Sequence, residues 1–235
     1  MNILDHLAIF TLGYPSLMAT IWICGGIYFY VHWERKQPWP TTFTWDENAP
    51  KVSVLLPCYN EGANVDETIY HLFKQNYPFM EVIAINDGSK DDTASRLDAL
   101  VLQYPALKVL HQANQGKASA MNNGLSQATG DTIVGIDGDA ILDYDAIGYM
   151  VSHFLSSPKV SGVTGNPRVR TRSTAIGKIQ TGEFSAIIGL IKRAQRIYGM
   201  VFTISGVICA FRRKALEEVG GWNTDMITED IDVSW

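Results

Sequence analysis

Four short runs of aliphatic and β-branched residues alternate with stretches suited to helices through the middle of the chain. The runs are residues 52–57, 81–86, 107–110 and 132–136, and the predicted helices are residues 65–75, 91–103, 117–128 and 144–155. Runs of this kind, bounded by turn residues, are typical of buried strands. Because strands that alternate with helices form a mostly parallel sheet with helices on both faces, the sequence predicts an α/β fold.

Local signals mark the ends of two of these helices. Asn64 and Glu67 have the spacing of a capping pair at the start of the first helix. Gly130 is placed to follow the end of the third helix.

The alternation stops after residue 158. Residues 160–169, which include Gly162 and Gly165, are predicted to form strands, and residues 178–198 one long helix. Its apolar stripe and its basic edge consist of Phe184, Ile187, Ile188, Ile191 and Tyr198, and of Lys192, Arg193 and Arg196. Two interpretations stay open, a helix packed on the core and a helix that lies on an anionic membrane surface.

The amino-terminal segment is apolar. Residues 7–31 contain no charged residue over 25 positions, and a helix of that length crosses a hydrocarbon core of about 30 Å. Aromatic residues that favour a membrane interface lie at Trp22, Tyr28, Tyr30 and Trp33. We expect residues 1–36 to be a retained membrane anchor. A cleaved signal peptide is the alternative, but the segment has no basic amino-terminal region and no obvious cleavage site.

Arg35 and Lys36 follow the apolar span, and basic residues beside a span stay on the cytoplasmic side. Residues 37–50, rich in proline and polar residues, are predicted to link the anchor to a domain over residues 51–235. We therefore expect that domain to face the cytosol.

Charge and cysteine content exclude some classes of function. The formal net charge is −5 with no long basic run to offset it, which argues against a nucleic-acid partner. Cys24, Cys58 and Cys209 are too few and too scattered for a disulfide framework or a zinc site. We expect the cysteines to serve packing.

Polar and acidic residues follow three of the four predicted strands. Tyr59 and Glu61 follow the first strand, Asp87 follows the second, and Asp137 and Asp139 follow the fourth. Open α/β sheets bind ligands at the carboxyl ends of their strands. We expect these five residues to converge in space although they are far apart in sequence.

Asp137 and Asp139 flank Gly138, which lets phosphate oxygens approach the backbone. Two carboxylates together with diphosphate oxygens and water supply the oxygen ligands that Mg²⁺ or Mn²⁺ prefers. The cation would neutralise charge on a departing nucleoside diphosphate. Asp137 and Asp139 are therefore predicted metal ligands.

Two further positions could contact a nucleotide. Asp87 lies in the turn sequence Asn-Asp-Gly-Ser, so it either ends a strand or accepts a hydrogen bond from a base or ribose. Lys117, after Gln115 and Gly116, begins a predicted helix whose free N–H groups would favour a diphosphate. The chain has no Walker motif, which argues against P-loop chemistry.

Asp230 lies at the start of a predicted helix after Thr228. One interpretation is an acid that the helix dipole stabilises. The other is a general base that takes the proton of an acceptor hydroxyl as it attacks an anomeric carbon. Together with the acidic residues upstream, the second interpretation favours a glycosyltransferase.

Six stretches of the chain resemble family 2 processive glycosyltransferases of the GT-A (Rossmann-like) fold, the group of the cellulose, chitin and hyaluronan synthases. Within this family the resemblance is closest to bacterial biofilm poly-β-1,6-N-acetyl-D-glucosamine synthases. The stretches are residues 83–89, 114–117, 136–140, 163–173, 189–199 and 226–232. Residues 163–199 are the part most specific to the subfamily.

The resemblance implies transfer of N-acetylglucosamine from UDP-GlcNAc to a growing polysaccharide acceptor, with inversion, at the bacterial inner (cytoplasmic) membrane. By motif match, Asp87 resembles the uracil-side carboxylate, Asp137 and Asp139 the nucleotide and metal pair, and Asp230 the base. Tyr59, Glu61 and Lys117 are the other expected nucleotide-sugar ligands. The resemblance further implies contact with membrane lipid and a small membrane subunit with cyclic di-GMP control.

The chain departs from the family pattern in one respect. The family carries a Gln-x-x-Arg-Trp motif after the helix of the base, followed by further membrane spans, whereas this sequence ends at Trp235. We expect the chain to be the amino-terminal part of a longer protein. The alternatives are a chitin- or hyaluronan-type synthase, a single transfer to a lipid carrier, or a catalytically silent nucleotide-sensing domain.

Overall fold

A computed structural model describes residues 2–36, 43–226 and 228–233. The chain divides into two compact units. The first comprises residues 1–41 and 166–202, and the second, which we call the sheet unit, comprises residues 42–165 and 203–235.

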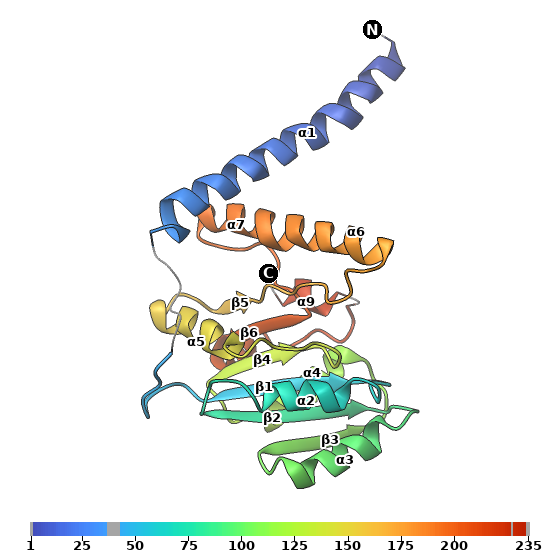
Figure 1. Cartoon of the computed structure of the whole chain (residues 1–235), viewed down its shortest axis with the longest axis vertical. Coiled ribbons are helices and arrows are strands. Elements are labelled where there is room, and N and C mark those ends of the chain that lie inside the picture. Colours follow the sequence, from blue (N-terminus) through green and yellow to red (C-terminus); the bar gives the residue numbers. More distant parts are fainter. Residues whose placement is uncertain (1, 37–42, 227, 234–235) are drawn as a thin grey trace. The chain divides into compact units, whose positions relative to one another are not determined.

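The sheet unit is built on a sheet of six strands within the described residues (Figure 1). The strands are β1 (Val52–Cys58), β2 (Met80–Asp87), β3 (Leu107–Gln112), β4 (Thr132–Ile136), β5 (Gly162–Thr164) and β6 (Ile208–Arg212), in the order β3-β2-β1-β4-β6-β5. The first four strands pair in parallel, whereas β6 pairs antiparallel with both β4 and β5. The prediction of a mostly parallel α/β sheet is thus confirmed.

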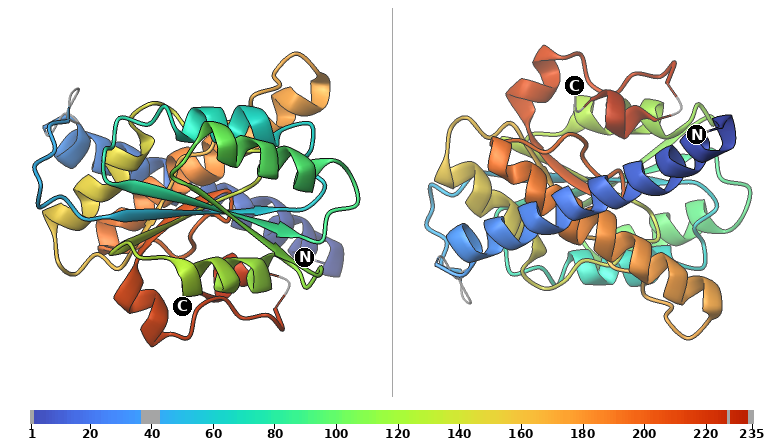
Figure 2. Two further views of the ribbon diagram at one scale, coloured as in Figure 1. Left: turned by 90° about the horizontal axis from the view of Figure 1, so that it is seen from below. Right: turned by 90° about the horizontal axis from the view of Figure 1, so that it is seen from above.

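Helices cover both faces of this sheet. They are α2 (Val65–Leu72), α3 (Thr93–Gln103), α4 (Lys117–Gln127), α5 (Ala146–Ser156), α8 (Arg213–Glu218) and α9 (Glu229–Asp232). In Figure 2, left, α2, α3 and α5 lie on one face and α4 on the other. Successive residues of a strand point to opposite faces, so Val54 and Leu56 join the core under α2 and α5, whereas Leu55 lies beside Gly124 of α4.

Four of the predicted strands have bounds close to those expected, and the fourth has the predicted ends. β6, which the sequence analysis did not predict, separates β4 from β5. The predicted strands over residues 160–169 reduce to the three residues of β5 among the described residues. β6 has five residues and both of its faces are buried, so its sequence shows little alternation of apolar and polar residues that could have predicted it.

The first predicted helix begins where expected, at Val65, but its cap and two predicted helix ends were wrong. Asn64 lies at the N-cap position of α2, yet its backbone is already helical and its side chain makes no capping hydrogen bond; its amide donates to Oε2 of Glu61 at 2.8 Å. The helix also ends at Leu72 rather than residue 75. Gly130 does not end α4, which stops at Gln127; it is needed because a side chain there would lie 2.6 Å from the backbone nitrogen of Ser53.

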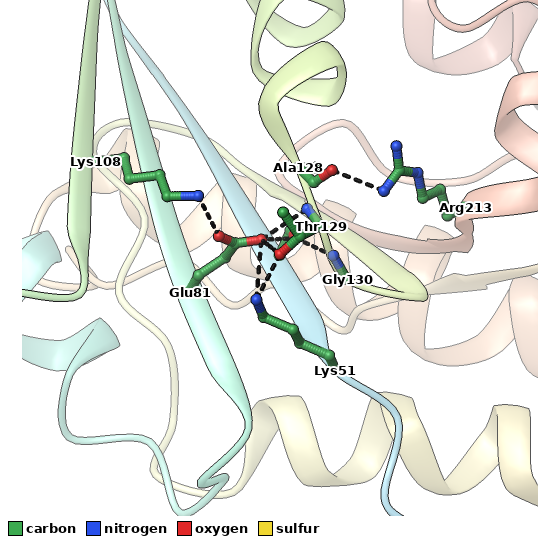
Figure 3. Close-up of polar contacts among 8 residues, drawn as sticks. Lys51, Glu81, Lys108, Ala128, Thr129, Gly130 and Arg213 are labelled. Atoms are coloured by element: carbon green, nitrogen blue, oxygen red, sulfur yellow. Dashed lines mark hydrogen bonds and ion pairs between the residues drawn. The ribbon is translucent and has the colours of Figure 1, made fainter.

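A buried carboxylate ties together the amino ends of the strands, at the end of the sheet opposite the residues predicted for the site. Glu81 of β2 is 6% exposed. Its Oε1 accepts hydrogen bonds from Ser53 and Thr129, and its Oε2 accepts one from Lys108 at 2.7 Å (Figure 3). Burial raises the pKa of Glu81, but the hydrogen bonds from Lys108, Ser53 and Thr129 outweigh it and lower the pKa to about 2.

The first unit contains two long helical stretches. α1 (Ile3–Phe29) begins with a capping box between Asn2 and Asp5 and continues as a π-helix over Tyr30–Glu34. The second stretch runs through α6 (Ala175–Phe184), a π-helix (Ser185–Ile191), α7 (Lys192–Gln195) and a 3₁₀ turn (Arg196–Tyr198). The helix predicted over residues 178–198 is therefore present, but it begins at residue 175, where Thr174 caps it.

The two stretches pack closely near the end of α1 (Figure 2, right). A side chain on Gly25 would lie 2.9 Å from Cβ of Ala194, so the glycine permits the approach. Arg193 pairs with Glu34 at 2.9 Å, and the guanidinium of Arg196 lies over the ring of Phe29. Two residues of the predicted basic edge therefore contact the first helical stretch, Arg193 at its π-helix and Arg196 at α1.

One helix in the described part of the chain, residues 5–34, is long and apolar enough to cross a membrane, with a mean hydropathy of 1.6. It contains the predicted span of residues 7–31. A signal sequence satisfies the same criterion, so the retained anchor stays a prediction.

Candidate active site

A pocket of about 270 Å³ lies at the carboxyl ends of β1, β2 and β4. It is lined by Pro57, Cys58, Tyr59, Glu61, Asp87, Lys117, Asp137, Gly138 and Asp139. The structure thus brings together all six residues predicted to bind the nucleotide sugar and the metal. The convergence follows from the parallel sheet, since the carboxyl ends of its strands meet at one edge.

The loop after β1 is fastened to the loop after β2. Asn60 adopts a left-handed conformation, with φ of 57°, which asparagine tolerates better than most residues. Its N–H donates to Oγ of Ser89 at 3.0 Å, and its Oδ1 accepts from the N–H of Lys90 at 2.8 Å. The N–H of Glu61 donates to Oγ1 of Thr93 at 2.8 Å. These contacts hold the backbone that carries Tyr59 and Glu61, and sequence reasoning missed them.

Asp87 is the last residue of β2 and is only 3% exposed. Its carboxylate accepts hydrogen bonds from Nε2 of Gln112 at 2.8 Å and from the N–H groups of Gln115 and Gly116, both at 2.9 Å. A carboxylate offers about four acceptor positions. Asp87 therefore does more than end a strand: it also anchors the loop that leads into α4 while it lines the pocket.

Lys117 opens α4 after Gly116, whose φ of 88° suits glycine. Its Nζ donates to Oδ1 of Asp137 at 2.5 Å and to the carbonyl of Gly206 at 3.2 Å. The predicted diphosphate-binding lysine thus lies at the start of a helix, beside a predicted metal ligand. A positive charge and a helix amino terminus at one place favour an anion.

Asp137 and Asp139 lie on the turn after β4, the first partly exposed and the second exposed. Gly138 between them is buried, and a side chain there would lie 2.8 Å from Cγ of Glu61. Oγ1 of Thr68 donates to its carbonyl at 3.0 Å and fixes the turn.

The donor set fits a hard divalent cation. The described residues include no group of three or more His, Cys, Asp or Glu side chains placed to hold a metal. A cation at Asp137 and Asp139 would therefore take most of its ligands from the diphosphate and from water. That is the usual arrangement for Mg²⁺ in phosphate sites.

Asp230 lies in α9 and does not line the 270 Å³ pocket. It lines a smaller cavity of about 10 Å³, together with Lys117, Gly206, Cys209, Trp222 and others. Oδ2 of Asp230 accepts a hydrogen bond from the N–H of Gly206 at 2.9 Å. Lys117 lines both spaces, so the predicted base is next to the nucleotide pocket rather than in it.

Burial makes the two cysteines of the sheet unit poor nucleophiles. It raises the pKa of the Cys58 thiol to about 12, with a smaller contribution from Glu61. It also raises the pKa of the Cys209 thiol to about 12. Both thiols stay protonated at neutral pH, as expected of cysteines that serve packing.

Sequence reasoning also missed a clamp on the chain that precedes α9. Asn122 of α4 accepts a hydrogen bond from the N–H of Trp222 at 2.9 Å and donates one to its carbonyl at 2.7 Å. Gly220 and Gly221 before it both have positive φ. The Gly-Gly-Trp sequence could have signalled a fixed turn, but its partner lies 100 residues away.

Comparison with known proteins supports a glycosyltransferase. The chain is 42% identical over 233 residues to the poly-β-1,6-N-acetyl-D-glucosamine synthase of Staphylococcus epidermidis. The aligned region covers 98% of this chain and 56% of the relative. The Staphylococcus aureus synthase is 43% identical and covers 96% of this chain and 55% of the relative. The chain thus spans a little over half the length of these relatives.

Solved structures share the fold. The mannosyltransferase PcManGT from Pyrobaculum calidifontis, in complex with GDP-Man and Mn²⁺, superposes with a TM-score of 0.68 at 26% identity, over 93% of this chain and 60% of that one. S. aureus TarS 1-349 in complex with UDP-GlcNAc superposes with a TM-score of 0.55 at 21% identity, over 78% of this chain and 52% of that one. The sheet unit therefore has the GT-A fold. The sequence profile of glycosyl transferase family 2 matches residues 53–220, and the chain belongs to this family.

Proposed function

We propose that the chain carries the catalytic domain of a membrane-bound, inverting N-acetylglucosaminyltransferase. In this proposal it transfers GlcNAc from UDP-GlcNAc to a growing β-1,6-linked poly-N-acetylglucosamine chain of the biofilm matrix. The observation that carries the proposal is the identity of 42–43% to synthases of that polymer, in alignments that cover 96–98% of this chain. The convergence of six expected ligands on one pocket supports it.

The nucleotide occupies the pocket at the strand ends. Asp87 contacts the uracil side, and Tyr59 and Glu61 line the wall after β1. Lys117 donates to the diphosphate. To do so, its Nζ gives up its hydrogen bond to Asp137. Asp137 and Asp139 hold Mg²⁺ or Mn²⁺, which would neutralise charge on the leaving diphosphate.

Asp230 acts as the general base. Its carboxylate takes the proton of the acceptor hydroxyl as that oxygen attacks the anomeric carbon and the bond to the diphosphate breaks. Attack opposite the leaving group inverts the anomeric configuration. Asp230 lines a small cavity that shares Lys117 with the nucleotide pocket, which supports a base close to the donor but outside its pocket.

The proposal places α1 across the bacterial cytoplasmic membrane with the sheet unit in the cytosol. Arg35 and Lys36 support this orientation. Membrane lipid, a small membrane subunit and cyclic di-GMP control belong to the proposal through the family resemblance alone.

A donor panel tests the proposed substrate. Membranes that contain the complete gene product are incubated with Mn²⁺ and with UDP-GlcNAc, UDP-GlcA or GDP-mannose, and nucleotide release and product size are measured. We expect turnover of UDP-GlcNAc and a polymer that a β-1,6-N-acetylglucosaminidase digests. A resistant polymer, a glycolipid product or a preference for GDP-mannose would each overturn the assignment. UDP binding with no turnover would indicate a silent nucleotide-sensing domain.

A further inference from the structure

The segment Ser205–Val207, which we call the bridging segment, connects the predicted base to the nucleotide side of the site. The N–H of Gly206 donates to Oδ2 of Asp230 at 2.9 Å, and its carbonyl accepts from Nζ of Lys117 at 3.2 Å. The carbonyl of Val207 accepts from the N–H of Asp137 at 3.1 Å. One short piece of backbone is thus bonded to the base, the lysine and the first metal ligand.

The bridging segment is itself fixed to the sheet. The N–H of Ser205 donates to Oγ1 of Thr164 in β5 at 3.0 Å. Val207 directly precedes β6, whose first residue, Ile208, pairs with Ile136 of β4. Because the segment is held at both ends, its N–H and C=O groups have defined directions.

A side chain at position 206 would crowd the Asp230 carboxylate, which would have to shift. A Cβ there would lie 2.9 Å from Oδ2 of Asp230, 3.2 Å from its Cγ and 3.3 Å from its Cβ. Gly206 is not among the residues with positive φ, so its backbone does not require glycine. The close approach of the Asp230 carboxylate is the reason that glycine stands at this position.

We propose that Gly206 is a positioning residue for the base: its N–H orients the Asp230 carboxylate, and its lack of a side chain lets the carboxylate lie there. The inference rests on the proposed function, because it takes Asp230 to be the base. Gly206 also accepts from Lys117, so it sets the base at a fixed place relative to the lysine that faces the diphosphate. General-base catalysis depends on such placement, since an error of about 1 Å can cost about 10²-fold in rate.

The test is Gly206→Ala in the complete gene product. We expect kcat for transfer to fall by about 10- to 100-fold. KM for UDP-GlcNAc and the metal-dependent Kd for UDP should stay within about twofold, because the substitution moves the base and not the groups that bind the nucleotide. Gly182→Ala is the matched control, because no heavy atom lies within 4 Å of a Cβ there, and it should leave kcat unchanged. A fall in UDP affinity equal to the fall in kcat would show a general structural role and overturn the inference.

A double mutant separates this inference from the proposed function. If Gly206 acts through Asp230, adding Gly206→Ala to Asp230→Asn should lower the residual rate by less than about twofold. Independent, multiplying effects would overturn the positioning role while Asp230 remained the base. Near-normal transfer by Asp230→Asn would instead remove the base assignment, and the inference with it.

A gentler change covers the case in which Gly206→Ala does not fold. Thr164→Val removes the hydrogen bond to the N–H of Ser205 and keeps the side-chain shape. We expect a smaller fall in kcat, about 3- to 10-fold, with unchanged UDP affinity. An unchanged kcat in a folded Thr164→Val protein would show that the bridging segment does not position the base.

Discussion

Replacement of Glu81 by glutamine should destabilise the sheet unit by about 2–3 kcal/mol at neutral pH. Glu81 accepts hydrogen bonds from Ser53, Lys108 and Thr129, which join β1, β2 and β3 to the turn before β4. Its pKa falls from 4.5 to about 2 in the folded protein. At 1.36 kcal/mol for each pH unit, that difference corresponds to about 3 kcal/mol. Lys108 and Lys51 are about half exposed, so solvent screening reduces the figure.

The effect should depend on pH with a defined sign. A carboxylate whose pKa is lowered by folding stabilises the protein above its unfolded pKa, and the stabilisation is lost as the pH falls through its folded pKa. Wild type should therefore exceed Glu81→Gln in stability at pH 7, and the difference should shrink between about pH 4.5 and pH 2. A protonated glutamate and a glutamine are nearly isosteric, so the two proteins should converge.

Urea unfolding of the full chain in detergent micelles, followed by tryptophan fluorescence, measures the difference. Asp66→Asn is the control, because Asp66 pairs with Arg96 on the surface and both side chains are about half exposed. An exposed pair of this kind contributes about 0–1 kcal/mol. A difference for Glu81→Gln below about 1 kcal/mol at pH 7, or one that does not change between pH 7 and pH 3, would refute the reasoning.

Three further outcomes are expected. Asp139→Asn should abolish metal-dependent UDP binding, because it removes an anionic oxygen from the cation; unchanged Mn²⁺-dependent affinity in isothermal titration would contradict the metal assignment. Asp230→Asn should leave UDP binding intact and lower transfer by about 10²-fold or more; if it transfers at near the wild-type rate with a normal melting temperature, Asp230 is structural. Protease added outside intact spheroplasts should leave the chain after residue 40 uncut, because the orientation proposed from Arg35 and Lys36 puts it in the cytosol; cleavage there without lysis would reverse the proposed orientation.

The parallel half of the sheet could be predicted from the sequence because its signals are local. Each of the first four strands is a short apolar run beside a turn, and the ligand-binding edge follows from their parallel order. The positions of Asp87, Asp137 and Asp139 at that edge needed no knowledge of their partners.

What could not be predicted depends on contacts between distant segments. β6 forms a strand because it pairs with β4 and β5, and the sequence of Ile208–Arg212 alone does not identify those partners. Asn64 lies at a sequence position typical of a helix cap, yet its side chain makes no capping hydrogen bond and its amide donates to Glu61. The hydrogen bond from Gly206 to Asp230 likewise cannot be predicted from the spacing of the two residues in the sequence, because it depends on how the chain returns to the sheet.

The place of β6 in the sheet has a consequence for folding during synthesis. β4 is complete at residue 136, but its outer neighbour begins at residue 208, and β5 pairs only with β6 in the described sheet. At about 5–20 residues per second, the edge of β4 stays without that neighbour for about 4–14 s while the first unit's second helical stretch is made. An open edge of a buried strand is a template for pairing with other chains. In any chain that stops before β6, this edge of β4 therefore stays uncovered. Such a chain is expected to aggregate before it loses the nucleotide pocket.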